Sequence, residues 1–269
     1  MSSYQTALTE FMTGRTLDQS VAAQDRSAAP VVLEVTGLTR RGEFADVSFT
    51  LHQGEVLGLT GMIGAGRTEL AHVLFGMARA DAGSVRLHGQ PVRFASNRDA
   101  VSAGVAYVSE DRLALWLIQP QSTRDNVVLA VLPGISGPLG LLSGRAQDDL
   151  VRHWIAELAI RIGQPGHAVS TLSGGNQQRM VLAKWLATKP QVLILDSPTV
   201  GVDVGARAGI FRIVRGLAAQ GLAILLISDE VTEVYLNADR ILHMAGGRIV
   251  GTYDPHAASN PELEGAVYA

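Results

Sequence analysis

A glycine-rich loop between an apolar strand and a helix is the feature that most constrains the fold of this chain. Residues 56–60 read as a buried strand and residues 69–75 as a helix. The loop region between them contains Gly61, Met62, Ile63, Gly64, Ala65, Gly66, Arg67, Thr68 and Glu69. This order is typical of a phosphate-binding loop, because glycines let backbone N–H groups wrap around phosphate oxygens at a helix N-terminus. It predicts a nucleotide site in which Thr68 is a ligand of Mg²⁺; on this motif alone, a glycine turn without a ligand stays open.

Arg67 stands where this loop motif has lysine. The chain has 22 basic residues, of which only Lys184 and Lys189 are lysines, and neither lies at the loop. Arginine keeps the positive charge, but its planar head does not fit between two phosphates as a compact ammonium does. We therefore expect phosphate binding, with the catalytic geometry in doubt.

Composition excludes several classes of function. The chain has no cysteine, which excludes thiol catalysis and cysteine-based zinc or iron–sulfur sites. Its net charge of −3 gives no general attraction to nucleic acid, so no nucleic-acid partner is expected. The seven histidines show no metal-ligand spacing. Without a secretion signal or a long apolar run, we expect a cytoplasmic protein.

The remaining pattern predicts an α/β fold with an inserted helical lobe. Residues 192–195 and 223–227 are apolar runs of the kind found in parallel strands buried on both faces. Residues 46–51 alternate as in a half-exposed strand, and residues 204–219 have helical spacing. A further helix is expected around residues 151–162, starting at the acidic turn Asp148-Asp149.

Two more motifs follow the loop. Leu172-Ser173-Gly174-Gly175-Asn176-Gln177 opens a helix, which again aims a helix N-terminus at an anion. Residues 191–195 then form an apolar strand that ends in Asp196, followed by Ser197 and the Gly201-Val202-Asp203 loop. A carboxylate delivered by a buried strand beside a phosphate loop can hold Mg²⁺.

In order and spacing, these motifs resemble those of ATP-binding cassette (ABC) ATPases, over residues 31 to 252. The fold class that the resemblance implies is α/β: a P-loop NTPase ABC cassette with a mainly parallel core sheet, an antiparallel β subdomain and an inserted α-helical subdomain. Residues 64–69, 107–112, 172–177 and 201–206 look more specifically like the C-terminal cassette of tandem sugar importers, and residues 11–15 resemble the end of a first cassette. This division implies a linker or tail at 1–29, a nucleotide-binding domain at 30–252 with its helical lobe at about 123–171, and a C-terminal tail at 253–269.

The resemblance also implies a degenerate site. Residues 61–69 would bind ATP, and Thr68 and Asp196 would hold Mg²⁺. Three catalytic positions of the family are substituted: Glu110 replaces the Q-loop glutamine, Ser197 replaces the glutamate after the metal-binding aspartate, and Asp229 replaces the switch histidine. Because a serine hydroxyl is no base at neutral pH, we expect this site to bind nucleotide and to hydrolyse it slowly or not at all.

Cassettes of this family work in pairs, so a second cassette is the first expected partner. It would be the N-terminal half of the same protein or a second copy of this chain. The signature residues Ser173, Gly174, Gly175 and Gln177 would act at the partner's nucleotide. A membrane permease is the second expected partner, docking in a groove between the helical lobe and residues 110–128, so that the chain would lie on the inner face of the cell membrane.

Some interpretations stay open at this stage. The apolar cluster of residues 115–118 is either part of the permease contact or the lobe's own core. Phe44 is expected to pack in the β-rich region rather than to stack on adenine, and His243 and Trp154 are assigned to structure. The chief alternative function is a catalytically inactive regulatory or structural nucleotide-binding module; a DNA-repair or translation ATPase is disfavoured, because no long or basic insertion is present.

Overall fold

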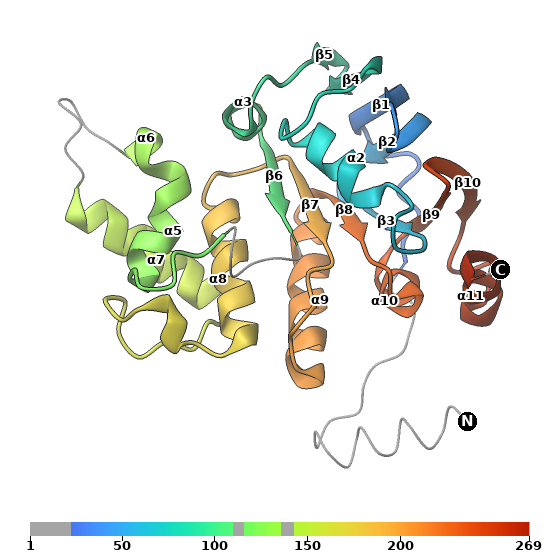
Figure 1. The fold of residues 1–269 in the computed structure, drawn as a ribbon. Coiled ribbons are helices and arrows are strands. Elements are labelled where there is room, and N and C mark those ends of the chain that lie inside the picture. Colours follow the sequence, from blue (N-terminus) through green and yellow to red (C-terminus); the bar gives the residue numbers. More distant parts are fainter. Residues whose placement is uncertain (1–22, 110–115, 136–142, 269) are drawn as a thin grey trace, which may run out of the picture.

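The structure is a computed structural model that describes residues 23–109, 116–135 and 143–268. Figure 1 shows two sheets with helices around them and a group of helices set to one side. Glu110, Leu115 and residues 11–15, which carry sequence expectations, lie outside the described residues.

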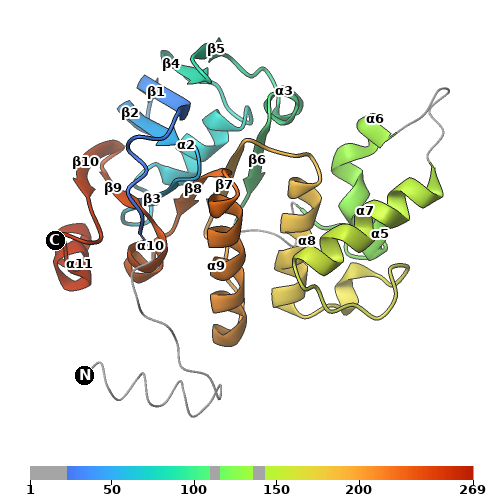
Figure 2. The ribbon, with the colours of Figure 1, turned by 180° about the vertical axis from the view of Figure 1, so that it is seen from behind.

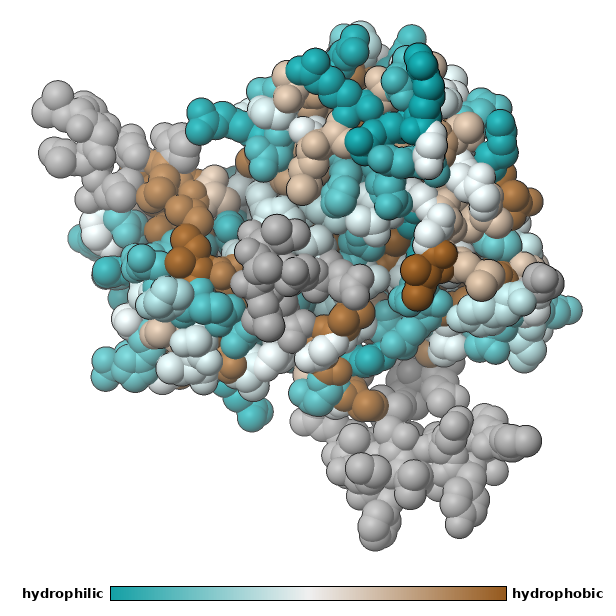
Figure 3. All heavy atoms as spheres, viewed as in Figure 1, coloured by the Kyte–Doolittle hydropathy of each residue, from teal (hydrophilic) through white to brown (hydrophobic). Residues whose placement is uncertain are grey.

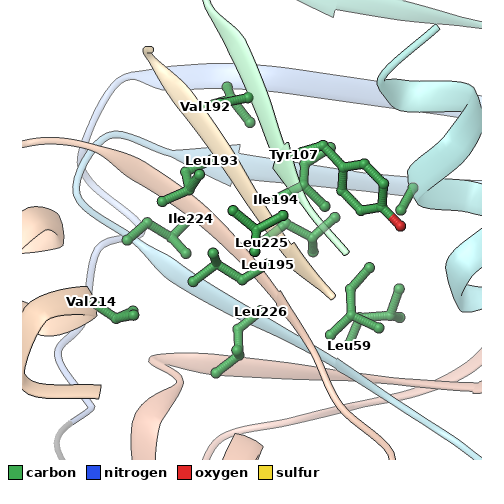
Figure 4. Packing of buried hydrophobic residues seen from close by; sticks show 14 of the residues in the cluster. Leu59, Tyr107, Val192, Leu193, Ile194, Leu195, Val214, Ile224, Leu225 and Leu226 are labelled. Atoms are coloured by element: carbon green, nitrogen blue, oxygen red, sulfur yellow. The ribbon is translucent and has the colours of Figure 1, made fainter. Parts of the chain in front are cut away.

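The larger sheet forms the centre of the molecule. In the described part of the chain it has six strands in the order β10-β9-β3-β8-β7-β6. They are β3 (Val56–Thr60), β6 (Val105–Val108), β7 (Val192–Asp196), β8 (Ala223–Ile227), β9 (Arg240–Ala245) and β10 (Arg248–Tyr253). Neighbours run parallel except β9 and β10. Every residue of β3, β6, β7 and β8 is buried, and Figure 4 shows side chains such as Leu193 and Leu225 packed in this core, which confirms the predicted buried strands.

The smaller sheet is antiparallel and has the order β2-β1-β4-β5. Its strands are β1 (Val31–Arg40), β2 (Phe44–His52), β4 (Ala82–Leu87) and β5 (Gln90–Val92). Along β2 the residues Val47, Phe49 and Leu51 are buried, which confirms the predicted alternation. Phe44 is also buried, at 3% exposure, as expected for a packing role. In Figure 3 the surface over this sheet is largely hydrophilic.

Helices α2 (Arg67–Leu74), α3 (Asn97–Ser102), α9 (Val204–Ala219) and α10 (Val231–Asn237) surround the sheets. Helix α9 has the predicted bounds, and the Asp203 side chain caps it by accepting a hydrogen bond from Ala206 N at 2.9 Å. Helix α9 packs against β8 of the central sheet (Figures 1 and 2).

The helical lobe contains α5 (Thr123–Val128), η1 (Leu129–Val131), α6 (Leu132–Ile135), α7 (Gly144–Glu157) and η3 (Val169–Thr171), with α8 (Gly174–Leu186) beside it. The predicted start of α7 is wrong. The helix begins at Gly144, where the Ser143 hydroxyl accepts a hydrogen bond from Ala146 N at 3.3 Å. Asp148 and Asp149 therefore lie inside the helix, because a serine cap one turn earlier satisfies the first free N–H groups.

The segment after Tyr253 carries a further helix, α11 (Asn260–Tyr268). Leu263 and Val267 are buried, and the helix packs on α10. Residues 254–268 therefore add to the packed body. Across the described residues, none of the helices combines the length and the apolar run needed to cross a membrane.

Candidate functional site

Three loops meet at one edge of the central sheet. Strands β3, β7 and β8 run parallel, and β8 pairs with both of the others. Because the carboxyl ends of parallel strands meet at one edge, the loop 61–66 after β3 lies close to Asp196 and Ser197 after β7 and to Asp229 after β8. The structure thus brings together these predicted site residues.

The phosphate-loop conformation requires glycine at two positions where side chains would collide with backbone. A Cβ at Gly61 would lie 2.1 Å from the carbonyl oxygen of Met244. At Gly66 the φ angle is 99°, and a Cβ would lie 2.8 Å from the carbonyl oxygen of Glu43. Gly66 caps α2, so the first N–H groups of that helix face the loop. This is the close backbone approach that a phosphate group needs.

The other loop residues differ in exposure. Met62 and Ile63 are exposed, at 58% and 88%, whereas Ala65 is buried. Gly64 is exposed as well and has a φ of 82°. The apolar tip of the loop is thus open to solvent in the single chain.

Arg67 is a buried cation with few hydrogen bonds. Its side chain is 9% exposed. Within the described residues, its guanidinium has one hydrogen bond, a long one of 3.5 Å from Nη2 to the carbonyl oxygen of Met62. Burial lowers the pKa of Arg67, and the nearby carboxylates of Asp229, Asp196 and Glu69 act in the opposite direction. A bound phosphate would supply the hydrogen-bond acceptors that the guanidinium lacks, together with a negative charge, so this residue fits a nucleotide.

Asp196 and Thr68 are the candidate metal ligands. Asp196 is 3% exposed, and its Oδ2 accepts a hydrogen bond from the Tyr107 hydroxyl at 3.0 Å. Burial raises the pKa of Asp196, while hydrogen bonds from Thr68 and Tyr107 lower it. The described residues contain no cluster of three or more histidine or acidic side chains suited to a metal. One hydroxyl and one carboxylate nevertheless suit Mg²⁺ at a nucleotide, since the phosphates and water provide its other ligands.

Ser197 and Asp229 are two residues that the sequence predicts at substituted catalytic positions, and both lie in the described part of the chain. Ser197 is 9% exposed and has a φ of 48°, held by a 2.8 Å hydrogen bond from its N–H to the carbonyl oxygen of Ile227. Asp229 lies within electrostatic reach of Arg67. A serine hydroxyl is no base for activating water at neutral pH.

The signature residues form the start of α8, away from the phosphate loop. Ser173 occupies the N-cap position, and a Cβ on Gly175 would lie 2.8 Å from the Cβ of Ala206. Gln177 is buried, and its Nε2 donates to the carbonyl oxygen of Leu172 at 2.9 Å. In Figures 1 and 2 α8 stands apart from α2. Within one chain the two motifs therefore do not form a common site.

Sequence reasoning missed a buried carboxylate behind the site. Glu233 on α10 accepts hydrogen bonds from the hydroxyls of Thr199 and Ser228, the latter at 3.0 Å. Arg207 lies 3.5 Å from it. Burial raises the pKa of Glu233. The two hydrogen bonds of Glu233 connect the loop after β7 with the loop after β8. No sequence motif identifies this glutamate.

Trp116 and Leu117, members of the apolar cluster, are buried at 7% and 5% exposure, whereas Ile118 is 45% exposed. The Trp116 ring packs edge-on against Tyr107 and Trp185, with centroids 5.8 and 5.1 Å apart. The first two residues are therefore buried, but Trp116 packs against β6 and α8 rather than in the lobe's own core. His243, in β9, is buried with a lowered pKa, consistent with its structural assignment.

Comparison with known proteins decides the family. The model of the ABC transporter family matches residues 44–200, more than half of the chain. The chain belongs to this family. Against solved structures, it superposes on the ADP conformation of MJ1267, an ATP-binding cassette of an ABC transporter, with a TM-score of 0.73 and 20% identity over 88% of this chain and 95% of that one. The expected cassette fold is thus confirmed.

Relatives found by sequence comparison share more identical residues with this chain than that solved structure does. The chain is 44% identical over 259 residues to ribose import ATP-binding protein RbsA 2 of Rubrobacter xylanophilus, which covers 96% of this chain and 50% of the relative. It is 39% identical over 257 residues to a putative ribose/galactose/methyl galactoside import ATP-binding protein of Pseudomonas fluorescens, with coverage of 96% and 50%. The chain therefore spans about half the length of the curated relatives it matches.

Proposed function

We propose that this chain is an ATP-binding cassette of a sugar importer and that it binds Mg-ATP at its own phosphate loop. The observation that carries the proposal is the buried Arg67, which has one long hydrogen bond within the described residues, in a loop whose Gly61 and Gly66 leave no room for a side chain. The sugar class rests on relatives that are named as ribose or galactose import proteins. The chain does not select the sugar itself in this proposal.

Each residue of the site has a distinct task. The backbone N–H groups of residues 61–66 and the start of α2 bind the phosphates, and Arg67 neutralises their charge. Thr68 and Asp196 hold Mg²⁺, which supplies charge neutralisation at the phosphate oxygens. The Tyr107 hydroxyl, 3.0 Å from Asp196, donates to that carboxylate and keeps it oriented.

The same site binds nucleotide without efficient hydrolysis. Ser197 replaces the residue that would take a proton from the attacking water, and it is held in place by its backbone rather than by an acid–base partner. Asp229 would place a negative charge beside the terminal phosphate, where further negative charge develops during hydrolysis. Glu110 replaces the third catalytic side chain. A general base is worth roughly 10²–10⁴ in rate, so its loss makes turnover at this site slow.

Hydrolysis would instead occur at a partner cassette. Ser173, Gly174 and Gly175 at the N-terminus of α8 would contact the terminal phosphate bound by that partner. Gln177 would stabilise the position of these residues, because its side-chain amide donates a hydrogen bond to the carbonyl oxygen of Leu172. The partner would be the other half of a tandem protein or a second copy, and the match to about half of each relative supports the first.

The helical lobe would dock on a membrane permease at the inner face of the cell membrane. Trp116, Leu117, Thr123 and residues 126–128 are buried, so residues 118–122, 124 and 125 remain as the contact surface. In this arrangement residues 1–29 serve as the linker from the preceding cassette, and residues 30–252 as the nucleotide-binding domain.

A regulatory module that never hydrolyses ATP is the second candidate, and the serine at position 197 favours it. Both candidates bind nucleotide. They differ in whether ATP hydrolysis by the full complex requires the signature residues of this chain. Ser173→Ala in the assembled transporter separates them. Lost ATPase activity supports the importer cassette, and unchanged activity supports the regulatory module.

The binding proposal is tested by titrating the chain with Mg-ATP in a calorimeter. We expect saturable binding that Arg67→Ala weakens at least about tenfold, since it removes charge-assisted hydrogen bonds. The matched control is Arg93→Ala, which removes an exposed arginine after β5. Absence of binding by the wild-type chain, or equal effects of the two variants, would contradict the proposal.

A further inference from the structure

The C-terminal helix is fixed beside the nucleotide edge of the sheet. Leu263 and Val267 of α11 are 0% and 3% exposed. Thr232 on α10 donates from its hydroxyl to Glu264 Oε1 at 3.1 Å, and Asn260 donates to the same Thr232 hydroxyl oxygen at 3.2 Å. Because α10 begins two residues after Asp229, these contacts set the position of α11 relative to the loop after β8.

The last described residue of α11 reaches that loop. The Tyr268 hydroxyl donates a hydrogen bond to the main-chain carbonyl oxygen of Asp229 at 3.2 Å, and the side chain is 57% exposed. Tyr268 is also among the groups whose charge would act on Arg67. A phenol hydroxyl is thus held near both the switch position and the phosphate loop, with room to turn.

We propose that Tyr268 is a nucleotide-binding residue that donates a hydrogen bond to the terminal phosphate of ATP. The inference rests on the proposed function, because it needs ATP in the loop. An ionised Asp229 side chain can only accept hydrogen bonds, whereas a tyrosine hydroxyl is a neutral donor at physiological pH. Tyr268 therefore supplies, from a helix remote in sequence, the donor that position 229 lacks.

The test compares ATP and ADP affinities of the chain with Mg²⁺ by calorimetry. ADP lacks the terminal phosphate, so Tyr268→Phe should weaken ATP binding by about tenfold and leave ADP binding within about twofold, as expected for one hydrogen bond to a charged group. Tyr253→Phe on β10 removes the same oxygen elsewhere and is the control. Urea midpoints of the variants establish that each is folded.

A second variant tests whether Tyr268 replaces a hydrogen-bond donor that is missing at position 229. Asp229→His provides a donor at the switch position, so Tyr268→Phe in that background should change ATP affinity by less than about threefold, because the donor is no longer unique. Equal ATP affinity of Tyr268→Phe and wild type would overturn the role of Tyr268, as would equal losses for ATP and ADP. Wild-type chain that binds no ATP would overturn both this inference and the proposed function, whereas normal binding with a silent Tyr268→Phe would overturn the inference alone.

Discussion

Replacement of Trp116 by alanine should destabilise the chain more than replacement of Trp154 by alanine. The indole is 7% exposed and packs edge-on against Phe75, Tyr107 and Trp185 with centroid distances of 6.3, 5.8 and 5.1 Å. Its Nε1 donates to the hydroxyl of Ser109, and the Lys184 ammonium lies 6.0 Å from its ring. Trp116→Ala removes these contacts at once.

The expected loss in free energy of unfolding is about 4 kcal/mol. Buried Trp-to-Ala substitutions cost about 3–5 kcal/mol, because transfer free energy is lost and a cavity remains. The edge-on aromatic pairs, worth about 0.5–1.5 kcal/mol each, place the cost in the middle of that range rather than at its lower end. A domain with a total stability of about 5–15 kcal/mol would remain folded but become sensitive to urea.

Urea unfolding followed by circular dichroism measures the difference. Trp154→Ala is the control, because this residue on α7 is only half-buried and should cost about 1–2 kcal/mol. Trp185→Phe in both backgrounds serves as a check on coupling, since Trp185 contacts the Trp116 ring. A loss below about 1.5 kcal/mol for Trp116→Ala, or a loss equal to that of Trp154→Ala, would refute the reasoning.

Three further substitutions probe the site. Gly61→Ala should abolish ATP binding and lower the unfolding free energy by about 2 kcal/mol or more, because its Cβ would lie 2.1 Å from a carbonyl oxygen; Gly144→Ala, with open space around it, should do neither. Burial raises the pKa of Asp196, so its contribution to stability is lost as pH rises through that raised pKa. Asp196→Asn should therefore be more stable than wild type in urea at about pH 7 and equal to it near pH 4, while Mg²⁺ no longer strengthens ATP binding. Glu233→Ala should cost about 2–3 kcal/mol in urea unfolding, because it leaves the Thr199 hydroxyl without its acceptor; a cost under about 0.5 kcal/mol would contradict the role of this carboxylate.

The parts of the fold that local sequence determines could be predicted. The strands β7 and β8 are continuous apolar runs, and α9 has both helical spacing and an aspartate cap, so the predicted ranges agree with the structure to within a residue. The glycine loop between β3 and α2 was also predictable, because its residues are contiguous in the sequence. Such features depend on neighbours along the chain.

Contacts between distant segments could not be predicted. Glu233 meets Thr199 from 34 residues away, and Tyr268 meets Asp229 from 39 residues away. Neither glutamate nor tyrosine in those places has a distinctive pattern, so only the packing of α10 and α11 shows their positions. The burial of Trp116, which lies in a turn, likewise depends on Trp185 in α8, which is why the sequence left it open.

The central claim is that this chain binds Mg-ATP at its own loop and hydrolyses it slowly or not at all. Single-turnover hydrolysis, with the chain in excess over ATP, tests this directly for wild type and for Ser197→Glu. We expect wild-type hydrolysis no faster than that of the Arg67→Ala variant, and at least about tenfold faster hydrolysis once glutamate provides a base at position 197. Rapid single-turnover hydrolysis by the wild-type chain, unchanged by Ser197→Glu, would contradict the claim.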